Sequence, residues 1–464
     1  MARHFFASLT RNTISLLGTA MATSSITLML VLLIIEHIGV GPGGAYLGII
    51  VFLILPVLFV IGLLLIPFGV MRERKRLKAG EDSGHFPVID LNISRTRRSV
   101  VIFLALTMIN LVILAAATYK GVEVMGSNEF CGTACHSVME PEDTAHKRSA
   151  HARVKCEQCH IGPGADWFVK SKLSGAWQLI AVTFDLYPRP VPTPIENLRP
   201  ARDTCEQCHW PTKFVGDKLI IDTSYEEDEA NTALQTALLL KVGGHRGNGS
   251  SGIHWHVDPG VQIRFRSGPQ REEMYQVELT RADGTNRLFE VRDLPEELGE
   301  WRTMDCVDCH NRPSHVYRLP DNEIDDSIDS GRIDQTLPFV KREGLRLIRN
   351  EYGSHEEAME VITRELKAFY AESYPDIVAE RGEDIDNAGT ELGMIYSYNV
   401  FPQMKVEWGT YPDHSGHDET PGCFRCHNRQ LKTADGDRIS RKCSLCHSVL
   451  ADKEQDPEIL TSIE

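Results

Sequence analysis

Uncharged apolar stretches are gathered at the N-terminal end of the chain. Three of them contain no Asp, Glu, Lys or Arg, at residues 12–35, 41–70 and 99–118. Each is long enough to cross the hydrocarbon core of a bilayer as a helix. Pro56 and Pro67 lie in the second stretch, and prolines are tolerated in membrane helices. The pattern therefore predicts a three-helix transmembrane anchor over residues 1–118.

The rest of the chain is more polar, and its periodic segments are short. Five prolines between Leu186 and Pro200 exclude a regular helix or strand there. Alternating polar and apolar residues over 274–291, around Ala282-Asp-Gly-Thr285, predict a β-hairpin. Two segments are predicted to be helical: residues 225–240, where an acidic start runs into Ala and Leu, and an insert over 322–386, whose periodicity is clearest between Val340 and Tyr370.

The basic side chains set the predicted orientation of the anchor. They lie before the first stretch or between the second and third, at Arg3, Arg11, Arg72, Arg74, Lys75, Arg76, Lys78, Arg95, Arg97 and Arg98. Loops rich in Lys and Arg stay on the cytoplasmic side. The N-terminus is therefore predicted to be cytoplasmic, and everything after residue 118 is predicted to be external.

The external part is strongly acidic. The whole chain has a formal charge of −15, and residues 1–118 contribute ten basic and five acidic side chains, which leaves −20 for the remainder. This charge argues against nucleic acid as a partner. It favours protein partners with basic docking patches, and a merely solubilising surface is the alternative.

All twelve cysteines form six closely spaced pairs, and a histidine directly follows each pair. Five pairs have the form C-x-x-C-H: Cys156-Cys159-His160, Cys205-Cys208-His209, Cys306-Cys309-His310, Cys423-Cys426-His427 and Cys443-Cys446-His447. This composition predicts only about 0.01 such matches by chance. In this motif two thiols add to the vinyl groups of one haem, and the histidine binds its iron. All six pairs lie after residue 118, on the side where c-type haem is attached.

Two other interpretations of the cysteines are weaker. Cys423-Cys426 and Cys443-Cys446 have the spacing of a zinc ribbon, but a zinc ribbon does not need the histidine that follows each pair. Six adjacent pairs in a long chain also differ from the disulfide framework of a small secreted fold. We therefore expect covalently bound haem, in a mainly α external domain with little regular structure and a small β-hairpin or sheet.

The first pair is irregular, because Cys131-Gly-Thr-Ala-Cys135-His136 has one extra residue between its thiols. Counting it, the chain would bind six c-type haems. Six second axial ligands would then be needed. The external candidates are His146, His151, His245, His254, His256, His315, His355, His414 and His417.

Local context orders these candidates. We favour five that lie near a motif or in an aromatic or glycine-rich context, namely His151, His254, His256, His315 and His417. His355, in the helical insert, is expected to be structural. His4 and His85 are excluded because the topology places them in the cytoplasm.

The run Phe130-Cys131-Gly-Thr-Ala-Cys135-His136-Ser-Val-Met139, followed by His146, His151 and Cys156-Glu-Gln-Cys159-His160, resembles the NapC/NirT/NrfH family of quinol-oxidising cytochromes. The resemblance covers roughly residues 100–215. It implies that Met139 is an iron ligand of the first haem and that the two histidines keep fixed distances from it. The extra residues here leave the ligand open between His136 and Met139.

The same resemblance implies a quinol pocket. The family places a lysine shortly after the second motif, and Lys170 or Lys172 occupies that stretch. The acidic partner expected about two turns later is not evident, and Gln178 lies near its place. The alternative role of these lysines is contact with anionic lipid headgroups.

Family members usually have one membrane helix and four haems, so this chain is more similar to larger inner-membrane cytochromes that export electrons. The expected segments are the anchor (1–118), a NapC/NirT-like domain with haems one to three (119–215), a haem-four region with the hairpin and the helical insert (216–400) and a two-haem tail (401–464).

The resemblance implies oxidation of (mena)quinol at haem one, with electrons relayed to a periplasmic cytochrome or reductase. The alternatives are a terminal reductase of a small nitrogen or sulfur oxyanion and a passive relay subunit. The expected location is the bacterial inner membrane.

Overall fold

A computed structural model of the protein describes residues 13–37, 54–79, 90–133, 136–161, 173–195 (except 176 and 179), 199–210, 216–245, 250–417 and 420–461. The chain divides into two compact units. The first comprises Met1–Ala134 and Lys155–Trp177, and the second comprises Cys135–Val154 and Gln178–Glu464.

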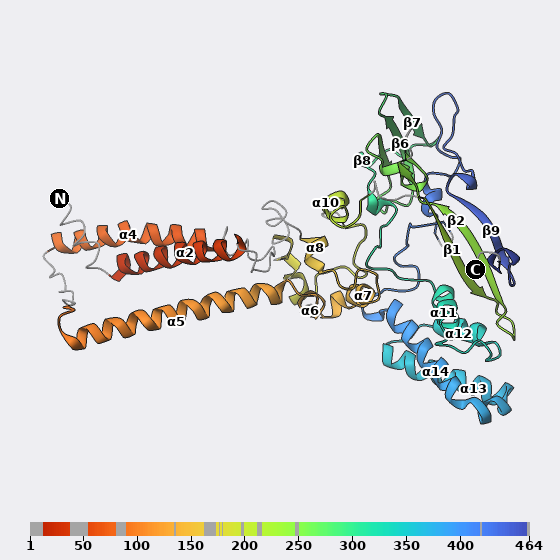
Figure 1. Ribbon diagram of the computed structural model, residues 1–464, viewed down its shortest axis with the longest axis horizontal. Coiled ribbons are helices and arrows are strands. Elements are labelled where there is room, and N and C mark those ends of the chain that lie inside the picture. Colours follow the sequence, from red (N-terminus) through yellow and green to blue (C-terminus); the bar gives the residue numbers. More distant parts are fainter. Residues whose placement is uncertain are drawn as a thin grey trace. The chain divides into compact units, whose positions relative to one another are not determined.

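The first unit contains three long helices, drawn in red and orange in Figure 1. They are α2 (Thr13–His37), α4 (Leu55–Lys78) and α5 (Ser94–Met125), and they are followed by the short helices α6 (Asn128–Thr133) and α8 (Cys156–His160). Within the described chain, two segments are long and apolar enough to cross a membrane, Thr13–Leu32 and Leu55–Glu73. The third predicted span lies inside α5, and its crossing of the membrane stays a prediction.

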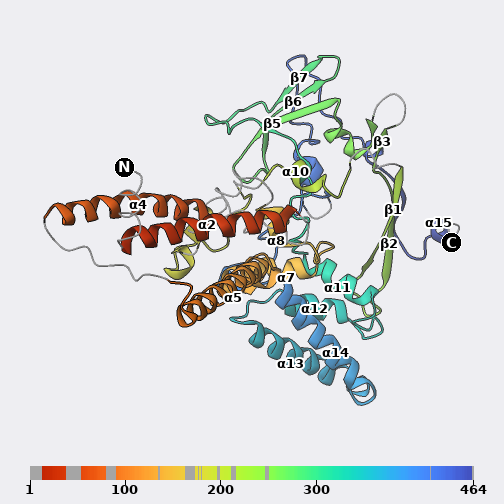
Figure 2. The same ribbon diagram turned by 60° about the vertical axis from the view of Figure 1, so that its left-hand side comes forward.

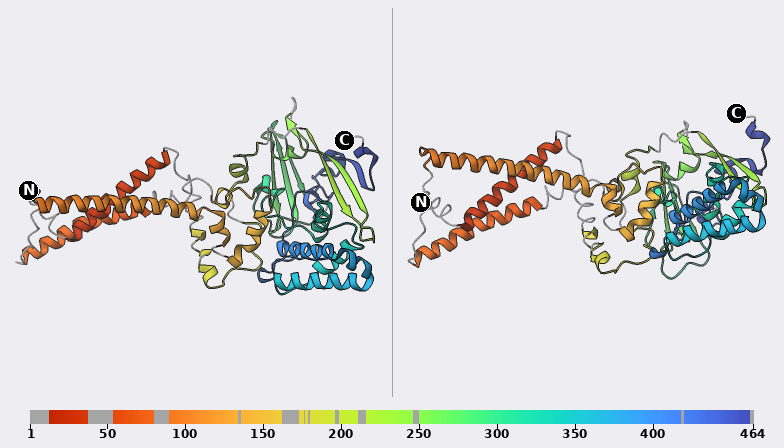
Figure 3. Two further views of the ribbon diagram at one scale, coloured as in Figure 1. Left: turned by 60° about the horizontal axis from the view of Figure 1, so that its bottom comes forward. Right: turned by 90° about the horizontal axis from the view of Figure 1, so that it is seen from below.

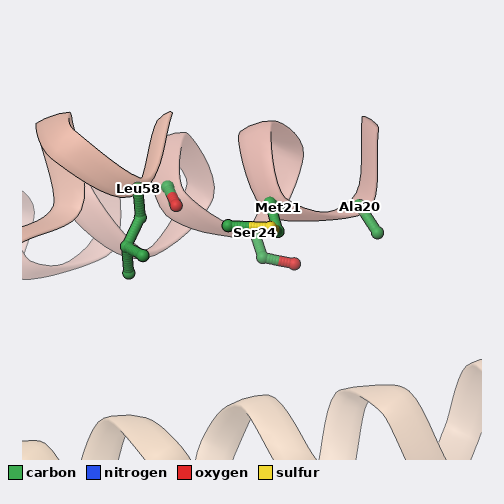
Figure 4. A pocket seen from close by; sticks show the side chains of 5 residues that line it. Ala20, Met21, Ser24 and Leu58 are labelled. Atoms are coloured by element: carbon green, nitrogen blue, oxygen red, sulfur yellow. The ribbon is translucent and has the colours of Figure 1, made fainter. Parts of the chain in front are cut away.

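Helices α2 and α4 pack closely because small residues meet where they touch. A Cβ atom on Gly18 would lie 2.7 Å from the carbonyl oxygen of Gly62. Close packing at small residues is how helices associate in a bilayer. The Ser15 hydroxyl also donates to the Ile66 carbonyl at 2.9 Å. A shallow hollow on this pair contains none of the predicted site residues, and it is lined by Ala20, Met21, Ser24, Ser25 and Leu58 (Figure 4).

The second unit contains two larger antiparallel sheets. One has the order β1-β2-β9, with β1 (Asp217–Tyr225), β2 (Ala233–Lys241) and β9 (His447–Glu454). The other has the order β7-β6-β5-β8, with β5 (Val261–Ser267), β6 (Met274–Arg281), β7 (Asn286–Glu290) and β8 (Arg302–Thr303). The short pair β3 (Gly244–His245) and β4 (Ser250–Ser251) lies between them in sequence.

The helix predicted for residues 225–240 is wrong, because residues 233–241 form strand β2 (Figure 2). All nine residues of β2 pair with β1, which supplies β-branched and aromatic residues such as Ile220, Ile221 and Tyr225. Strand β9 covers its other edge. This pairing outweighs the helix propensity of Ala and Leu.

The predicted β-hairpin is confirmed as β6 and β7, which pair in register from Gln276 to Thr280. In the turn, Gly284 has a φ of +82°. The amide of Thr285 donates to the Asp283 carboxylate at 2.9 Å, as Asp and Gly favour in such turns. The proline-rich connector also has no helix or strand between Leu186 and Ile195, as predicted for that part.

The helical insert is confirmed and is longer than predicted. It consists of α11 (Pro320–Asp329), α12 (Val340–Ile348), α13 (His355–Ser373) and α14 (Pro375–Asn399). Helices α13 and α14 lie side by side (Figure 3). Their core is fully buried at Ile362, Leu366 and Tyr370 of α13 and at Leu392 of α14. The insert therefore has a side-chain core of its own and contains no cysteine.

The tip of the β1-β2 hairpin is held against the insert by Asn231. Its side-chain amide donates to the carbonyls of Gln335 and Leu337, each at 2.8 Å. Its carbonyl oxygen accepts from the amide of Lys341 at 3.1 Å. Asn231 also has a φ of +47°, a conformation that asparagine tolerates better than most residues.

The remaining elements are short and carry or flank the motifs. They are α7 (His136–Lys147), α10 (Ala201–Cys205), η3 (Ile253–Val257), η4 (Cys306–Asp308), η5 (Pro402–Met404), η6 (Gly422–Arg425), η7 (Cys443–Leu445) and α15 (Glu458–Thr461). The second unit is thus mostly helical, with small sheets between the motif segments.

Candidate haem-binding sites

The regular motifs fold as single tight turns. Cys156–His160 is one turn of helix. In the next three motifs the amide of the histidine donates to the carbonyl of the first cysteine, with distances of 2.8 Å for His209 and Cys205, 2.8 Å for His310 and Cys306, and 3.1 Å for His427 and Cys423. In a helical turn, residues three and four apart lie on one face. Such a turn can therefore present two thiols and an imidazole to one ring.

A second imidazole faces the histidine of four motifs. The four pairs, with the distances between ring centroids, are His151–His209 (6.0 Å), His254–His310 (6.4 Å), His256–His427 (5.9 Å) and His417–His447 (6.0 Å). Bonds from a metal to imidazole nitrogen are about 2 Å long, so two imidazoles on opposite sides of one iron have centroids about 6 Å apart. The spacing of these pairs fits a haem iron between the rings.

Hydrogen bonds orient several of these rings. The Nδ1 atom donates to a backbone carbonyl in His151 (to Pro313, 3.0 Å), His254 (to Val242, 2.9 Å), His256 (to Ile253, 2.7 Å) and His427 (to Ser440). A bond of this kind fixes the tautomer and leaves Nε2 as the metal ligand. His151, His254 and His256, all among the favoured histidines, thus already have the orientation that an iron ligand needs.

Burial also favours the neutral form of these side chains, which is the form that binds metal. Loss of solvent lowers the pKa of His256. The same cause lowers the pKa of His310, and the neighbouring His254 adds to it.

His315, the fifth favoured histidine, faces His146 instead of a motif histidine. Their ring centroids are 6.2 Å apart. His315 donates from Nδ1 to the Glu142 carbonyl at 3.0 Å, and its burial lowers its pKa to about 4. In contrast, His146 uses Nε2 toward the Val154 carbonyl at 3.1 Å. His315 is thus oriented like the other candidate ligands, whereas His146 is not.

His355 does not resemble the candidate ligands. Its Nε2 hydrogen-bonds to the Val400 carbonyl at 2.7 Å, and its ring contacts Phe401 edge-on with centroids 5.3 Å apart. This arrangement supports its expected structural role. His414 is not among the histidines that the sequence context favoured as iron ligands. It is buried, and loss of solvent lowers its pKa to about 4.

The chain just before the first motif is linked to the second motif through Asn128, at the start of α6. Its side-chain carbonyl accepts from the Cys156 amide at 2.9 Å and from the Cys156 thiol at 3.3 Å. A Cβ atom on Gly126 would lie 2.7 Å from the Glu157 carboxylate, so the chain at Gly126 also passes close to the second motif. The chain after α5 is therefore fixed against the second motif.

Motifs three to six form a continuous series within the second unit. The amide of Ala201, in the short helix α10 that ends at Cys205, donates to the carboxylate of Asp305 at 2.8 Å, and Asp305 directly precedes Cys306, so motifs three and four are joined. Arg425, inside motif five, donates to the carbonyl of Asp308, inside motif four. Phe424 of motif five stacks on His417, which faces His447 of motif six.

Several predicted site residues lie outside the described residues: Cys135, Lys170 and Lys172, and the side chains of His136 and His245. Met139 lies in α7 and is half-buried. Across the described chain, no group of three or more His, Cys, Asp or Glu side chains gathers as a site for a bare metal ion. Sequence reasoning missed Asn128, Asp308 and Arg425, and the only available signal was their position inside or just before a motif.

Two comparisons place this arrangement in a family. The model of the NapC/NirT cytochrome c family, N-terminal region, matches residues 93–188, which include the first two motifs. Cytochrome c-type protein ImcH of Geobacter sulfurreducens is 41% identical over 458 residues, which cover 96% of this chain and 90% of the relative. No solved structure matches the chain. The chain therefore belongs to the NapC/NirT cytochrome c family, as the sequence resemblance predicted.

Proposed function

We propose that this membrane-anchored cytochrome c oxidises (mena)quinol next to its first motif and passes the electrons through six covalently bound haems to a periplasmic redox protein. Its family binds haem covalently and transports electrons. The main observation in support of an electron relay is that four motif histidines each face a second histidine, with ring centroids about 6 Å apart.

Two histidines on one iron support electron transfer over chemistry on a small substrate. If haem were held between the two histidines of such a pair, the protein would supply both iron ligands, and nitrite or a sulfur oxyanion would find no open place. Bound haem supplies one-electron exchange at its iron. The protein contributes the ligands, their fixed orientation and the close succession of sites from Cys205 to His447. We therefore propose closed sites at motifs three to six, with His151, His254, His256 and His417 as the second ligands.

The entry point is proposed at the membrane surface. Helix α5 has 32 residues, which is about 48 Å of helix, longer than the roughly 30 Å hydrocarbon core. Its uncharged stretch ends at Thr118, and Cys131 follows only a few residues after α5 ends at Met125. If α5 is the third span, the first haem lies close to the lipid, where quinol is dissolved. The same topology puts the N-terminus in the cytoplasm and all the motifs outside the inner membrane.

An apolar stripe of exposed side chains follows the second motif in sequence and supports a membrane-surface position for this segment. Leu173 and Trp177 are 70% and 60% exposed, and Ile180 and Phe184 are 47% and 69% exposed. Exposed apolar and aromatic side chains of this kind are typical of segments that lie in the membrane interface. Lys170 and Lys172 directly precede this stripe in sequence.

We propose that one of these lysines binds the quinol headgroup and assists the loss of its protons. Quinol oxidation releases two electrons and two protons, so the pocket needs a group that hydrogen-bonds the hydroxyl while the electrons leave singly. For the first haem, His136 and Met139 are the candidate ligands on one side. We also propose His315 as an iron ligand near the first motif. Its Nδ1 donates to a backbone carbonyl, as in the other candidate ligands.

The test is quinol-dependent reduction of the purified protein in lipid vesicles, followed by haem absorbance. Replacing Lys170 and Lys172 together with alanine should slow reduction by menaquinol at least tenfold while haem content and reduction by dithionite stay unchanged. Lys218→Ala with Lys367→Ala, at exposed positions of β1 and α13, is the matched control for loss of two charges. Unchanged quinol reduction in the double variant would instead support lipid contact by the two lysines.

A further inference from the structure

Arg425 occupies an unusual place, since it lies between the two cysteines of motif five and yet is only 7% exposed. Its guanidinium donates to three backbone carbonyls: Gly422 at 2.9 Å, Arg271 at 2.7 Å and Asp308. The Gly422 carbonyl belongs to its own turn, and that of Asp308 belongs to motif four. The buried cation is thus fixed at the junction of two motifs, with carbonyls around it.

Carboxylates near this cation have other partners. Asp308 accepts from Arg302 at 2.8 Å and from the Asp305 amide at 2.7 Å, and it lies 3.8 Å from the guanidinium of Arg271. Asp305 accepts from the amides of Cys306 and Ala201. The positive charge of Arg425 is therefore satisfied by dipoles and is not cancelled in a direct ion pair.

The charge of Arg425 lies beside both motifs. Its guanidinium donates to the carbonyl of Asp308, which directly precedes Cys309 and His310 of motif four. Arg425 itself directly precedes Cys426 and His427 of motif five. One buried cation thus lies next to the proposed attachment points of two haems.

The second ligands of the same two sites are also joined. His254 and His256 lie on the single turn η3, where His254 faces His310 of motif four and His256 faces His427 of motif five. The two sites are therefore held together on both sides, by η3 and by Arg425. Haems in these sites would form a fixed pair.

We propose that Arg425 raises the reduction potentials of the haems bound by motifs four and five, so that an electron moving along the relay dwells at this pair. The inference rests on the proposed relay function. An added electron lowers the charge at iron by one, and a fixed cation stabilises that reduced state. Burial strengthens the effect, because solvent screens a buried charge less than an exposed one.

Potentiometric titration of the purified protein, followed by haem absorbance, tests the proposal with three variants. Arg425→Gln should shift a fraction of the absorbance equal to two haem sites to lower potential. Arg425→Lys should keep most of the wild-type potential, because it retains the charge. Arg364→Gln, at an exposed position of α13 in the insert that contains no motif, removes the same charge and should change nothing.

A structural clamp without an electrostatic role would give a different result. In that case Arg425→Lys and Arg425→Gln would shift the titration equally, which would overturn the proposal. Should the Arg425 variants not fold, Arg271→Gln removes a cation at the edge of the same cluster and should shift the same fraction downward, whereas no shift would count against the idea.

The outcomes also separate this proposal from the proposed function. If the purified protein lacked haem in motifs four and five, the relay itself would fail, and the pyridine haemochrome assay would then count fewer than six haems per chain. Full haem content with an unchanged titration in Arg425→Gln would leave the relay standing and reject only the role of Arg425.

Discussion

The ring of His417 lies almost flat against that of Phe424, with centroids 4.3 Å apart and planes 18° from parallel. Phe424 belongs to motif five, whereas His417 faces the histidine of motif six. An aromatic stack of this kind is worth about 1 kcal/mol. One side chain of motif five therefore helps to hold the ligand of the next site.

Replacing Phe424 with alanine should loosen His417. Since His417 is a proposed iron ligand, the reduced variant should bind carbon monoxide about fivefold faster at one haem, as about 1 kcal/mol implies. Flash photolysis measures this rate. Phe369→Ala, which removes a ring in the helical insert, should leave it unchanged, and equal rates in both variants would show that the stack does not support His417.

Removing a facing histidine should open one site completely. His254→Ala and His256→Ala should each create one carbon monoxide site in the reduced protein, at motifs four and five respectively, and the double variant should create two. His355→Ala is the control: it should bind no carbon monoxide and should lose about 1–3 kcal/mol of stability, because the Val400 carbonyl is left unpaired. Absorbance difference spectra with carbon monoxide give the count. No new site in His254→Ala would contradict the pairing with His310.

The apolar stripe should contact lipid. Trp177→Phe should remove most of the quenching that brominated lipids cause in the tryptophan fluorescence of the protein in vesicles. Trp408→Phe, whose indole donates to the Ile348 carbonyl near the helical insert, should leave the quenching unchanged. Replacing Trp177 and Phe184 together with serine should also slow reduction by menaquinol while reduction by dithionite stays fast. Equal quenching before and after Trp177→Phe would place the stripe away from the bilayer.

Asn231 should matter for stability out of proportion to its size. Alanine at this position leaves two carbonyls and one amide without their partner, which should cost about 2–4 kcal/mol. Chemical denaturation followed by far-ultraviolet circular dichroism measures the loss. Asn286→Ala, at an exposed position of the β6-β7 hairpin, should cost under about 0.5 kcal/mol. A comparable loss in both variants would mean that the hairpin tip is not anchored through Asn231.

The sequence was sufficient to predict structural features that depend on residues close together in the chain. The motif turns and the Ala282–Thr285 hairpin turn follow from residues a few positions apart, so their spacing was sufficient. Helical periodicity identified the insert for the same reason. The family resemblance, later confirmed, depended on one contiguous run from Phe130 to His160.

What the sequence could not predict depends on distant segments. Residues 233–241 have the composition of a helix, and only their pairing with β1 and β9 makes them a strand. His254 was favoured as a ligand, but its partner His310 lies far along the chain. The bond between Arg425 and Asp308, 117 residues apart, left no local pattern at all.

The strand that follows motif six has a consequence for the order of maturation. Lys241, at the end of β2, bonds to the Ser444 carbonyl, 203 residues later, and β9 then covers the edge of β2. Because a chain is made from its N-terminus, the β1-β2 hairpin must wait with an open edge while more than half of the chain after residue 118 is still being synthesised. Open strand edges invite pairing with other chains. The segment that contains motif six is thus also the cap that ends this exposure, and a chain cut short before Cys443 would lose its protection from aggregation together with its last motif.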